Sequence, residues 1–232
     1  MQLKCKEIKK NFSIRFDLHK SHRHLTDWQS AEVDKIWAEQ QKSRLLFDGL
    51  LLSVKAVTDE FLIGDWVDYR YLIAQQMSSS LRSVLNIIPV GISSTTRCGD
   101  SILMGKRASF LANYPNCYEC APSGGVDADS VKGNEVDISS FIIKELEEEV
   151  GLSPRDVAKI EPTTLCFDPS AQAYEVVVSI EIRPEAYDKV GPTMEYPEIF
   201  WLKKNEIHSF LNLHKDAILP LSQELLRRVA NT

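Results

Sequence analysis

The chain has 232 residues, a length typical of one large domain or two small ones. Hydrophobic residues make up 44% of it, and glycine and proline number only ten each, so the composition suits a packed core and excludes collagen-like and low-complexity chains. Lys and Arg number 27 and Asp and Glu 33, and the resulting net charge of −6 argues against a general nucleic-acid binder.

The charge is distributed unevenly along the chain. Residues 1–46 hold ten Lys or Arg and six Asp or Glu, a net of +4, whereas residues 47–232 hold 17 and 27, a net of −10. The second part therefore either spreads its negative charge over the surface or binds cations with some of it.

The cysteines and the N-terminus bear on the cellular compartment. An odd number of cysteines, five, without regular spacing does not indicate a disulfide framework, so we expect reduced thiols, as in a cytosolic protein. The pair Cys117-x-x-Cys120 has no second pair to complete a zinc site. No apolar signal segment opens the chain, and no apolar run approaches the roughly 18 residues of a membrane span. We expect a cytoplasmic protein without membrane or nucleic-acid partners.

The first 85 residues have the pattern of a small α/β region. Weak alternation predicts one or two strands in 1–20, and an apolar stripe behind a cap at Thr26 or Asp27 predicts a helix in 26–46. A turn at Asp48-Gly49 then leads into an apolar strand, and alternating side chains predict a further strand over 65–76.

Residue 86 begins a different pattern, which we take as a second domain, 86–232. Strands alternate there with a polar, glycine-containing loop at 123–137 and with two helices, and this mixture indicates an α/β or α+β fold. The expected strands are 86–95, 101–109, 117–122, 163–167, 173–183 and 198–202, and the expected helices are 138–150 and about 216–230.

The helix at 138–150, called the acidic helix below, carries the most informative segment. Each residue of an α-helix turns by about 100°, so Glu148 lies about 60° to one side of Glu145 and Glu149 about 40° to the other. The three carboxylates therefore share one face. The apolar residues Ile142 and Leu146 fall beside them, whereas Glu147 is expected to face solvent.

Such a face is costly for an isolated helix. Like charges at i, i+4 repel one another, and they stand near the C-terminal end, where the helix dipole disfavours negative charge. A divalent cation removes the repulsion, and Mg²⁺ prefers oxygen ligands while leaving room for substrate phosphates. A solvated acidic surface is the alternative interpretation.

Residues 144–152 resemble the second half of the Nudix box, whose pattern is G-x5-E-x7-R-E-U-x-E-E-x-G-U with U an apolar residue. The matching fixed positions are Glu145, Leu146, Glu148, Glu149, Gly151 and Leu152. The turn Pro122-Ser123-Gly124-Gly125 is similar to the Pro-Gly-Gly turn before the box, with a serine inserted. The resemblance implies a Nudix-type mixed β-sheet sandwiched between helices, with an N-terminal α/β extension.

Two features depart from the pattern. Lys144 stands where the family has arginine, which keeps the charge but not the bidentate fork. Counting forward from Gly125 or back from Lys144 puts a valine where the first box glutamate belongs, so the loop contains an insertion. Glu135 or Asp137 is expected to supply that carboxylate.

The resemblance implies a hydrolase that cleaves the pyrophosphate of a nucleoside diphosphate linked to another group. Glu145, Glu148 and Glu149 would hold Mg²⁺, or Mn²⁺ in its place, which neutralises phosphate charge and lowers the pKa of bound water. Lys144 lies one turn before Glu148 and is expected to pair with it. The family often adds a carboxylate from a late loop, for which Glu195 is the first choice and Glu198 the second.

Further residues are expected around a small-molecule nucleotide substrate. An N-terminal region before a core with a lengthened box loop is similar to the branch of the family that hydrolyses UDP-glucose and UDP-galactose to UMP and a sugar 1-phosphate. Hydrolysis of ADP-ribose or another dinucleotide, and a nucleotide-binding module without catalysis, stay open. Residues 1–85 are expected to set specificity or to mediate a homodimer. The substrate-binding candidates are Arg107 for a phosphate, Gly124 and Gly125 in the turn, and Tyr69 and Arg70 for the base or sugar, with packing as the alternative for the tyrosine.

Overall fold

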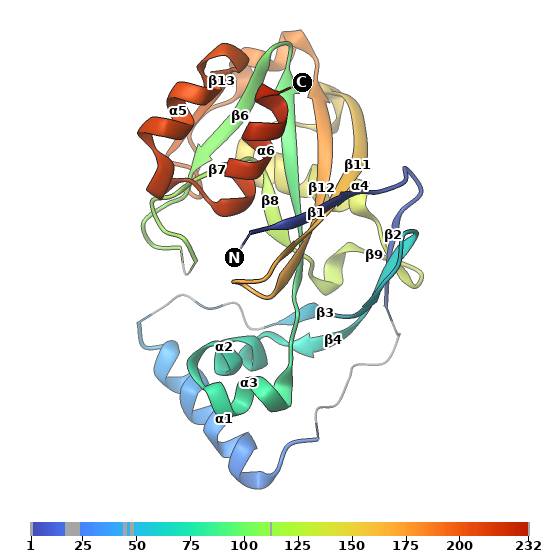
Figure 1. Ribbon diagram of the computed structural model, residues 1–232, viewed down its shortest axis with the longest axis vertical. Helices are drawn as coiled ribbons and strands as arrows, with labels where there is room; N and C mark the ends of the chain where they lie inside the picture. The colour runs from blue at the N-terminus through green and yellow to red at the C-terminus, as the bar shows by residue number, and fades with distance from the viewer. Residues whose placement is uncertain (1, 17–23, 44–45, 47–48, 112, 232) are drawn as a thin grey trace.

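A computed structural model describes residues 2–16, 24–43, 46, 49–111 and 113–231. A large sheet with helices on both sides forms the upper part of the molecule in Figure 1, and a small sheet with three helices forms the lower part. No helix in the described part of the chain is long and apolar enough to cross a membrane.

The larger sheet has the strand order β1-β11-β12-β5-β6-β13, with β8 added to β5 and β7 added to β6. β12 and β5 are parallel, whereas the other described neighbours are antiparallel. β5 pairs with β6 only next to the turn that joins them. Beyond that point the two strands separate, so β8 pairs with β5 and β7 pairs with β6. The strands are β1 (Lys4–Glu7), β5 (Val90–Cys98), β6 (Ser101–Lys106), β7 (Tyr118–Cys120), β8 (Ser123–Gly125), β11 (Val157–Asp168), β12 (Ala173–Ile182) and β13 (Glu198–Lys203).

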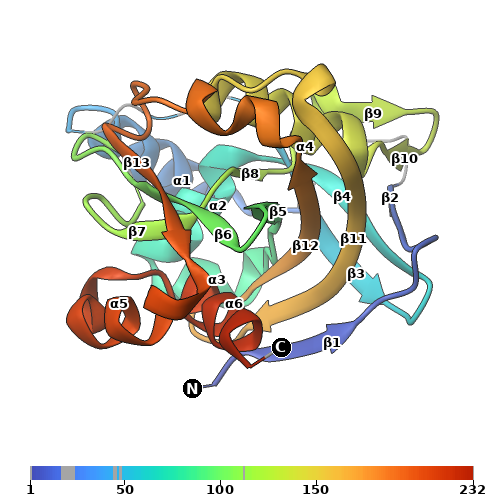
Figure 2. The same ribbon diagram turned by 90° about the horizontal axis from the view of Figure 1, so that it is seen from above.

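Helices cover both faces of this sheet, as Figure 2 shows. α4 (Ile138–Glu145) lies on one side, and α5 (Ile207–Leu213) and α6 (Pro220–Ala230) lie on the other. Alternation along the strands divides the core accordingly, because Leu103 packs in the cluster that includes α4 and Met104 packs in the cluster that includes α6. The predicted mixed α/β class is confirmed.

The smaller sheet joins the first part of the chain to the second. Its order is β3-β4-β2-β10-β9, with β2 parallel to β4. β2 pairs with β10, and in the larger sheet β1 pairs with β11, so residues 1–85 contribute strands to both sheets rather than forming a sheet apart. The strands are β2 (Ser13–Phe16), β3 (Leu50–Val57), β4 (Phe61–Asp68), β9 (Val131–Lys132) and β10 (Glu135–Val136).

Three helices complete the lower part: α1 (Asp27–Gln40), α2 (Tyr69–Met77) and α3 (Ser79–Leu85). The expected start of α1 is confirmed, since the Thr26 side chain accepts from the Gln29 N–H and the Gln29 side chain accepts from the Thr26 N–H. The helix ends at Gln40, earlier than expected. The predicted turn at Asp48-Gly49 falls partly outside the described residues, because Asp48 is not among them.

The strand predicted over 65–76 is wrong from Tyr69 onward. β4 ends at Asp68, and α2 begins at Tyr69. Leu72 and Ile73 are buried at the i+3 and i+4 positions from Tyr69, which is the spacing of a helix face. Three alternating residues, 69–71, are too few to outweigh that spacing.

The expectation of reduced thiols is wrong for two cysteines. The sulfur atoms of Cys5 and Cys166 are joined at 2.10 Å, because the register of β1 and β11 places the two residues opposite each other. They are 161 residues apart in sequence, so no local pattern indicates the pair. The three other cysteines are free. The expected cytoplasmic location thus loses the support it drew from reduced thiols.

Candidate active site

The acidic helix changes its geometry where the carboxylates begin. α4 ends at Glu145, a π-helical turn follows over Leu146–Val150, and Gly151 ends the helix with a φ of 79°. A left-handed glycine at this position is the expected C-terminal stop. The apolar stripe is confirmed, since Ile142, Leu146 and Val150 are all at most 1% exposed.

The three glutamates of this segment differ in their burial. A π turn advances the chain by less rotation per residue than an α-helix, and such turns are frequent at functional sites. Glu149 is only 5% exposed, whereas Glu147 and Glu148 are exposed and Glu145 is partly buried. The face that the α-helical spacing predicts is therefore divided into a buried carboxylate, a half-buried one and an exposed one.

Glu149 is held through one of its two carboxylate oxygens. Oε2 accepts a hydrogen bond from the backbone N–H of Ser123 at 3.1 Å and lies 3.3 Å from the hydroxyl of Tyr196. Among the described residues both contacts fall on Oε2, which leaves Oε1 for a ligand.

The carboxylates raise one another's pKa. Burial, and after it the charge of Glu148, raises the pKa of Glu145 to about 7, while Lys144 opposes this shift. Burial, and after it the charges of Glu195 and Glu145, raises the pKa of Glu149 well above its usual value. A bound divalent cation would supply the positive charge that stabilises the ionised forms of both groups.

The turn before the acidic helix approaches it closely. A Cβ atom on Gly124 would lie 2.8 Å from Cδ of Glu145 and 2.9 Å from the Phe141 ring, whereas one on Gly125 would meet nothing within 4 Å. Gly124 thus lets the backbone lie against the glutamate, which is the physical reason for a glycine here.

Gly124→Ala is expected to lower the free energy of unfolding by about 1–3 kcal/mol, because the added methyl group overpacks the contact with Glu145 and Phe141. Urea unfolding measures the change. Gly125→Ala is the matched control, with an expected change below about 1 kcal/mol. Equal losses in the two variants would show that the close approach of Gly124 does not matter.

Lys144 contacts a residue that the sequence analysis did not single out. In the described part of the chain its Nζ lies 3.9 Å from Oδ2 of Asp127 rather than beside Glu148, so the predicted Lys144–Glu148 pair is wrong. Asp127 follows the glycine turn by two residues and also raises the pKa of Glu145. A sequence signal existed, since Asp127 is the first acid after Gly125.

Neither candidate for the first box glutamate faces the carboxylates. The Glu135 carboxylate accepts from Nε of Arg15 on β2 at 2.9 Å. Asp137 caps the start of α4 by accepting from the Ser140 N–H, at the opposite end of that helix from Glu145. The expectation that Glu135 or Asp137 joins the site is wrong, and Asp127 is the acid that approaches Lys144 instead.

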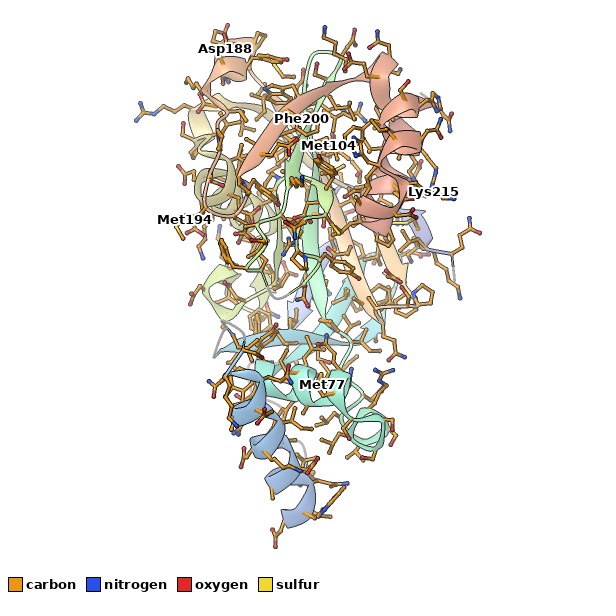
Figure 3. All side chains as sticks on the ribbon, turned by 90° about the vertical axis from the view of Figure 1, so that its left-hand side faces the viewer. Met77, Met104, Asp188, Met194, Phe200 and Lys215 are labelled. Carbon is orange, nitrogen blue, oxygen red and sulfur yellow. A yellow bond between two sulfur atoms is a disulfide. The ribbon has the colours of Figure 1, made fainter. Side chains whose placement is uncertain are left out.

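The structure brings Glu195 to the site but not Glu198. Glu195 raises the pKa of Glu149 and Glu145, and its backbone carbonyl accepts from the Ala108 N–H at 2.8 Å. Met194 beside it is 84% exposed and points away from the molecule in Figure 3, so this loop lies at the surface. Glu198 lies on β13 and pairs with Lys106 at 3.5 Å.

Arg107 lies near the carboxylates with internal partners. Its Nη1 donates to Oε1 of Glu119 at 2.6 Å, and its Nε donates to the backbone carbonyl of Asn113 at 3.1 Å. Only 14% of the side chain is exposed. Its contact with a substrate phosphate stays a prediction.

Tyr69 and Arg70 are not brought together with the carboxylates. Both start α2, where the Tyr69 ring contacts Trp37 and the Arg70 guanidinium pairs with Asp34 at 3.0 Å, so both contact α1. Packing is the role the structure gives Tyr69.

The sequence analysis missed two buried residues of the site, Glu119 and Tyr196. Glu119 is 3% exposed and Tyr196 is fully buried, and the tyrosine hydroxyl lies 2.8 Å from Oε1 of Glu119. Glu119 alternates with Tyr118 and Cys120 in an apolar strand, and an acid inside such a strand was the available signal.

Glu175 on β12 is a further acid with a shifted pKa. Burial raises its pKa to about 7, the Ser93 hydroxyl that donates to it at 3.0 Å opposes the shift, and Glu119 adds to it. Because its pKa rises on folding from 4.5, the folded state binds the proton more tightly. Its contribution to stability is therefore complete below pH 4.5 and is lost as the pH approaches 7.

Glu175→Gln is expected to flatten the pH dependence of unfolding, because the amide keeps the contact with Ser93 and does not titrate. The wild type should lose on the order of 3 kcal/mol from this group between the two pKa values, and the variant should not. Urea unfolding at about pH 5 and about pH 7.5, without metal, compares the two proteins. An identical decrease in both would contradict the assignment.

The donor set of the site fits a hard cation. Glu145, Glu148 and Glu149 offer oxygen atoms alone, which suits Mg²⁺ and Mn²⁺. Across the described residues, no three His, Cys, Asp or Glu side chains already surround a cation-sized position. The arrangement is therefore open, and Glu148, whose side chain is exposed, is free to turn toward a cation held by the other two.

The sequence and the structure were each compared with known proteins. No family model matches the sequence, and no curated protein matches it. Among solved structures, the Deinococcus radiodurans protein DR0079 is 16% identical over 77% of this chain and 98% of its own, with a TM-score of 0.49.

Two further solved structures carry more informative names. A MutT protein of Methanosarcina mazei is 16% identical over 62% of this chain and 94% of its own, with a TM-score of 0.44. A Nudix hydrolase of Nitrosomonas europaea is 15% identical over 62% of this chain and 70% of its own, also with a TM-score of 0.44. At these values the activity has to be inferred from the residues of the chain itself.

Proposed function

We propose that this protein is a Nudix-type hydrolase that uses Mg²⁺ or Mn²⁺ to cleave the pyrophosphate of a nucleoside diphosphate-linked compound. The observation that carries the proposal is the cluster of Glu145, Glu148 and Glu149 beside the Gly124 turn. Two of these carboxyls have raised pKa values, which is a cost that a cation offsets. A helix serving only as a solvated surface has no reason to bury Glu149.

Each residue has a role in this chemistry. Bound divalent cations would neutralise the phosphate oxygens and lower the pKa of an attacking water. Glu149 and Glu145 would hold the cations from the buried side and Glu148 from the exposed side. Glu195 lies close enough to influence the pKa of Glu145 and Glu149, and we assign it the role of the late carboxylate that binds metal or accepts a proton from water. Lys144 pairs with Asp127 at 3.9 Å beside the turn.

We assign a UDP-sugar as the substrate, with UMP and a sugar 1-phosphate as products. The support is the similarity of the N-terminal region and the lengthened box loop to the branch that acts on UDP-sugars. Incubation with UDP-sugars, ADP-ribose and dinucleotides at saturating Mg²⁺ or Mn²⁺, with analysis of products, tests this. The assignment is supported if only UDP-sugars are hydrolysed, with UMP and a sugar 1-phosphate as the products. If only ADP-ribose or a dinucleotide is hydrolysed, with release of AMP, the second candidate activity replaces it.

A nucleotide-binding module without catalysis is the competing class. The loop insertion and Lys144 favour it, whereas the three intact glutamates oppose it. Titration of the wild type with UDP-glucose separates binding from turnover. Binding without hydrolysis at saturating Mg²⁺ would establish the module.

We assign residues 1–85 a role in specificity or in homodimer formation. Leu51 on β3 forms a β-bridge with Asp127, so this region lies directly beside the turn that precedes the acidic helix. Sedimentation with and without substrate distinguishes the two roles. A stable dimer in both conditions favours the interface.

A further inference from the structure

A buried hydrogen-bond network lies behind Glu149, and Glu119 is its centre. Oε1 of Glu119 accepts from Nη1 of Arg107 at 2.6 Å and from the Tyr196 hydroxyl at 2.8 Å. Oε2 accepts from the Ser123 hydroxyl at 3.0 Å. Both oxygens of Glu119 thus accept hydrogen bonds from described residues, and the largely buried Arg107 guanidinium lies beside its charge.

Tyr196 links this network to Glu149. Its hydroxyl lies between Oε1 of Glu119 and Oε2 of Glu149, at 2.8 and 3.3 Å. The ring is fully buried against Gly105, where a Cβ atom would lie 2.5 Å from a ring carbon. Gly105 thus leaves the space that the ring occupies, and the hydroxyl lies within hydrogen-bond distance of both carboxylates.

The same segment holds the backbone of Glu149. The Thr193 hydroxyl donates to the Glu149 carbonyl at 2.9 Å, and the Tyr196 N–H donates to the Thr193 hydroxyl at 3.1 Å. Ser123 also contacts both acids, through its N–H to Glu149 and its hydroxyl to Glu119. Glu149 is therefore held at its carbonyl and at one carboxylate oxygen, which directs the other oxygen away from the network.

We propose that Arg107, Glu119 and Tyr196 are positioning residues that orient the Glu149 carboxylate toward a bound divalent cation. The inference rests on the proposed function for the identity of that cation. Groups that orient metal ligands in this way typically change metal affinity or activity about 10–100-fold when they are removed. A purely structural role would instead change stability and leave the affinity for metal as it was.

Tyr196→Phe tests this, because it removes one hydroxyl and keeps the ring against Gly105. Binding of Mn²⁺ is measured by electron paramagnetic resonance without substrate, and the Mg²⁺ dependence of hydrolysis is measured separately. The control is Tyr118→Phe, which removes a hydroxyl that contacts the exposed Glu198 and keeps the ring in the core cluster that includes α6. Thermal unfolding of each variant without metal records any loss of stability.

The expected result is a weakening of Mn²⁺ affinity by about 10–100-fold in Tyr196→Phe and none in Tyr118→Phe. Wild-type Mn²⁺ affinity in a folded Tyr196→Phe protein would overturn the proposal. If that variant does not fold, Glu119→Gln replaces it, with the same expected weakening and the same overturning result.

The two proposals fail in different ways. A wild type that binds Mn²⁺ in a Tyr196-dependent manner but hydrolyses no nucleoside diphosphate compound contradicts the proposed function and leaves the positioning role intact. A wild type that hydrolyses such a compound, with no dependence of Mn²⁺ affinity on Tyr196 or Glu119, contradicts the positioning role alone. A wild type that binds no Mn²⁺ overturns both.

Discussion

Glu149→Gln is expected to lower metal-dependent hydrolysis by about 10²–10³-fold, the loss typical when one group that stabilises transition-state charge is removed. Glutamine matches the size of glutamate and can accept from the Ser123 N–H, so the fold should persist. It does not supply the negative charge that a cation needs. The measurement is kcat/KM at saturating Mg²⁺ on the best substrate of the panel, with circular dichroism to confirm folding.

Glu147→Gln is the matched control for this variant. Glu147 lies two residues away on the same π turn, and its side chain is exposed. Its substitution removes the same charge from the helix, so any general electrostatic effect appears in both variants. Equal loss of activity in the two would show that Glu149 has no special place in the site.

Leu146→Ala is expected to lower the free energy of unfolding by about 2–5 kcal/mol, because it removes a fully buried side chain and leaves a cavity. Leu146 anchors the acidic helix to the core beside Ile142 and Val150. Urea unfolding at constant pH measures the loss.

Leu146→Met is the control for Leu146→Ala, because it changes the side chain without leaving a large cavity. It keeps nearly the same volume, so the expected loss is below about 1.5 kcal/mol. A loss of less than about 1 kcal/mol in Leu146→Ala would mean that this stripe does not anchor the helix. In that case contacts other than this apolar stripe would have to hold Glu145 and Glu149 in position.

The sequence predicted the acidic helix well because its information is local. The positions of Ile142, Leu146 and Val150 follow from helical spacing, and Gly151 ends the helix as expected. The π turn over Leu146–Val150 was not predictable from the spacing of apolar residues. Local periodicity sets which face is apolar but does not fix the rotation within one turn.

Partners distant in sequence were not predictable. Cys5 and Cys166 meet through strand register, and Glu119 and Tyr196 meet although 77 residues separate them. The spacing of the box pattern indicates a residue near Glu135, and Asp127 lies outside that spacing. Such contacts depend on tertiary packing, which no short pattern within one sequence contains.

Around residues 69–71 a local pattern predicted the wrong secondary structure. Its alternation is short, and tertiary packing of Leu72 in one cluster with Val33 of α1 and Leu81 of α3 favours a helix. The consequence for function is direct, because Tyr69 and Arg70 contact α1 instead of the carboxylates.

The central claim is that the carboxylates of the acidic helix bind a divalent cation that the hydrolysis requires. The most direct measurement strips the wild type with EDTA and then follows release of UMP from UDP-glucose, and of AMP from ADP-ribose, as Mg²⁺ is added back. We predict no release without metal and saturable release with it, and a rate lowered by about 10²–10³-fold in Glu149→Gln. Release that is independent of Mg²⁺ and Mn²⁺, or no release of nucleoside monophosphate at any metal concentration, would contradict the account.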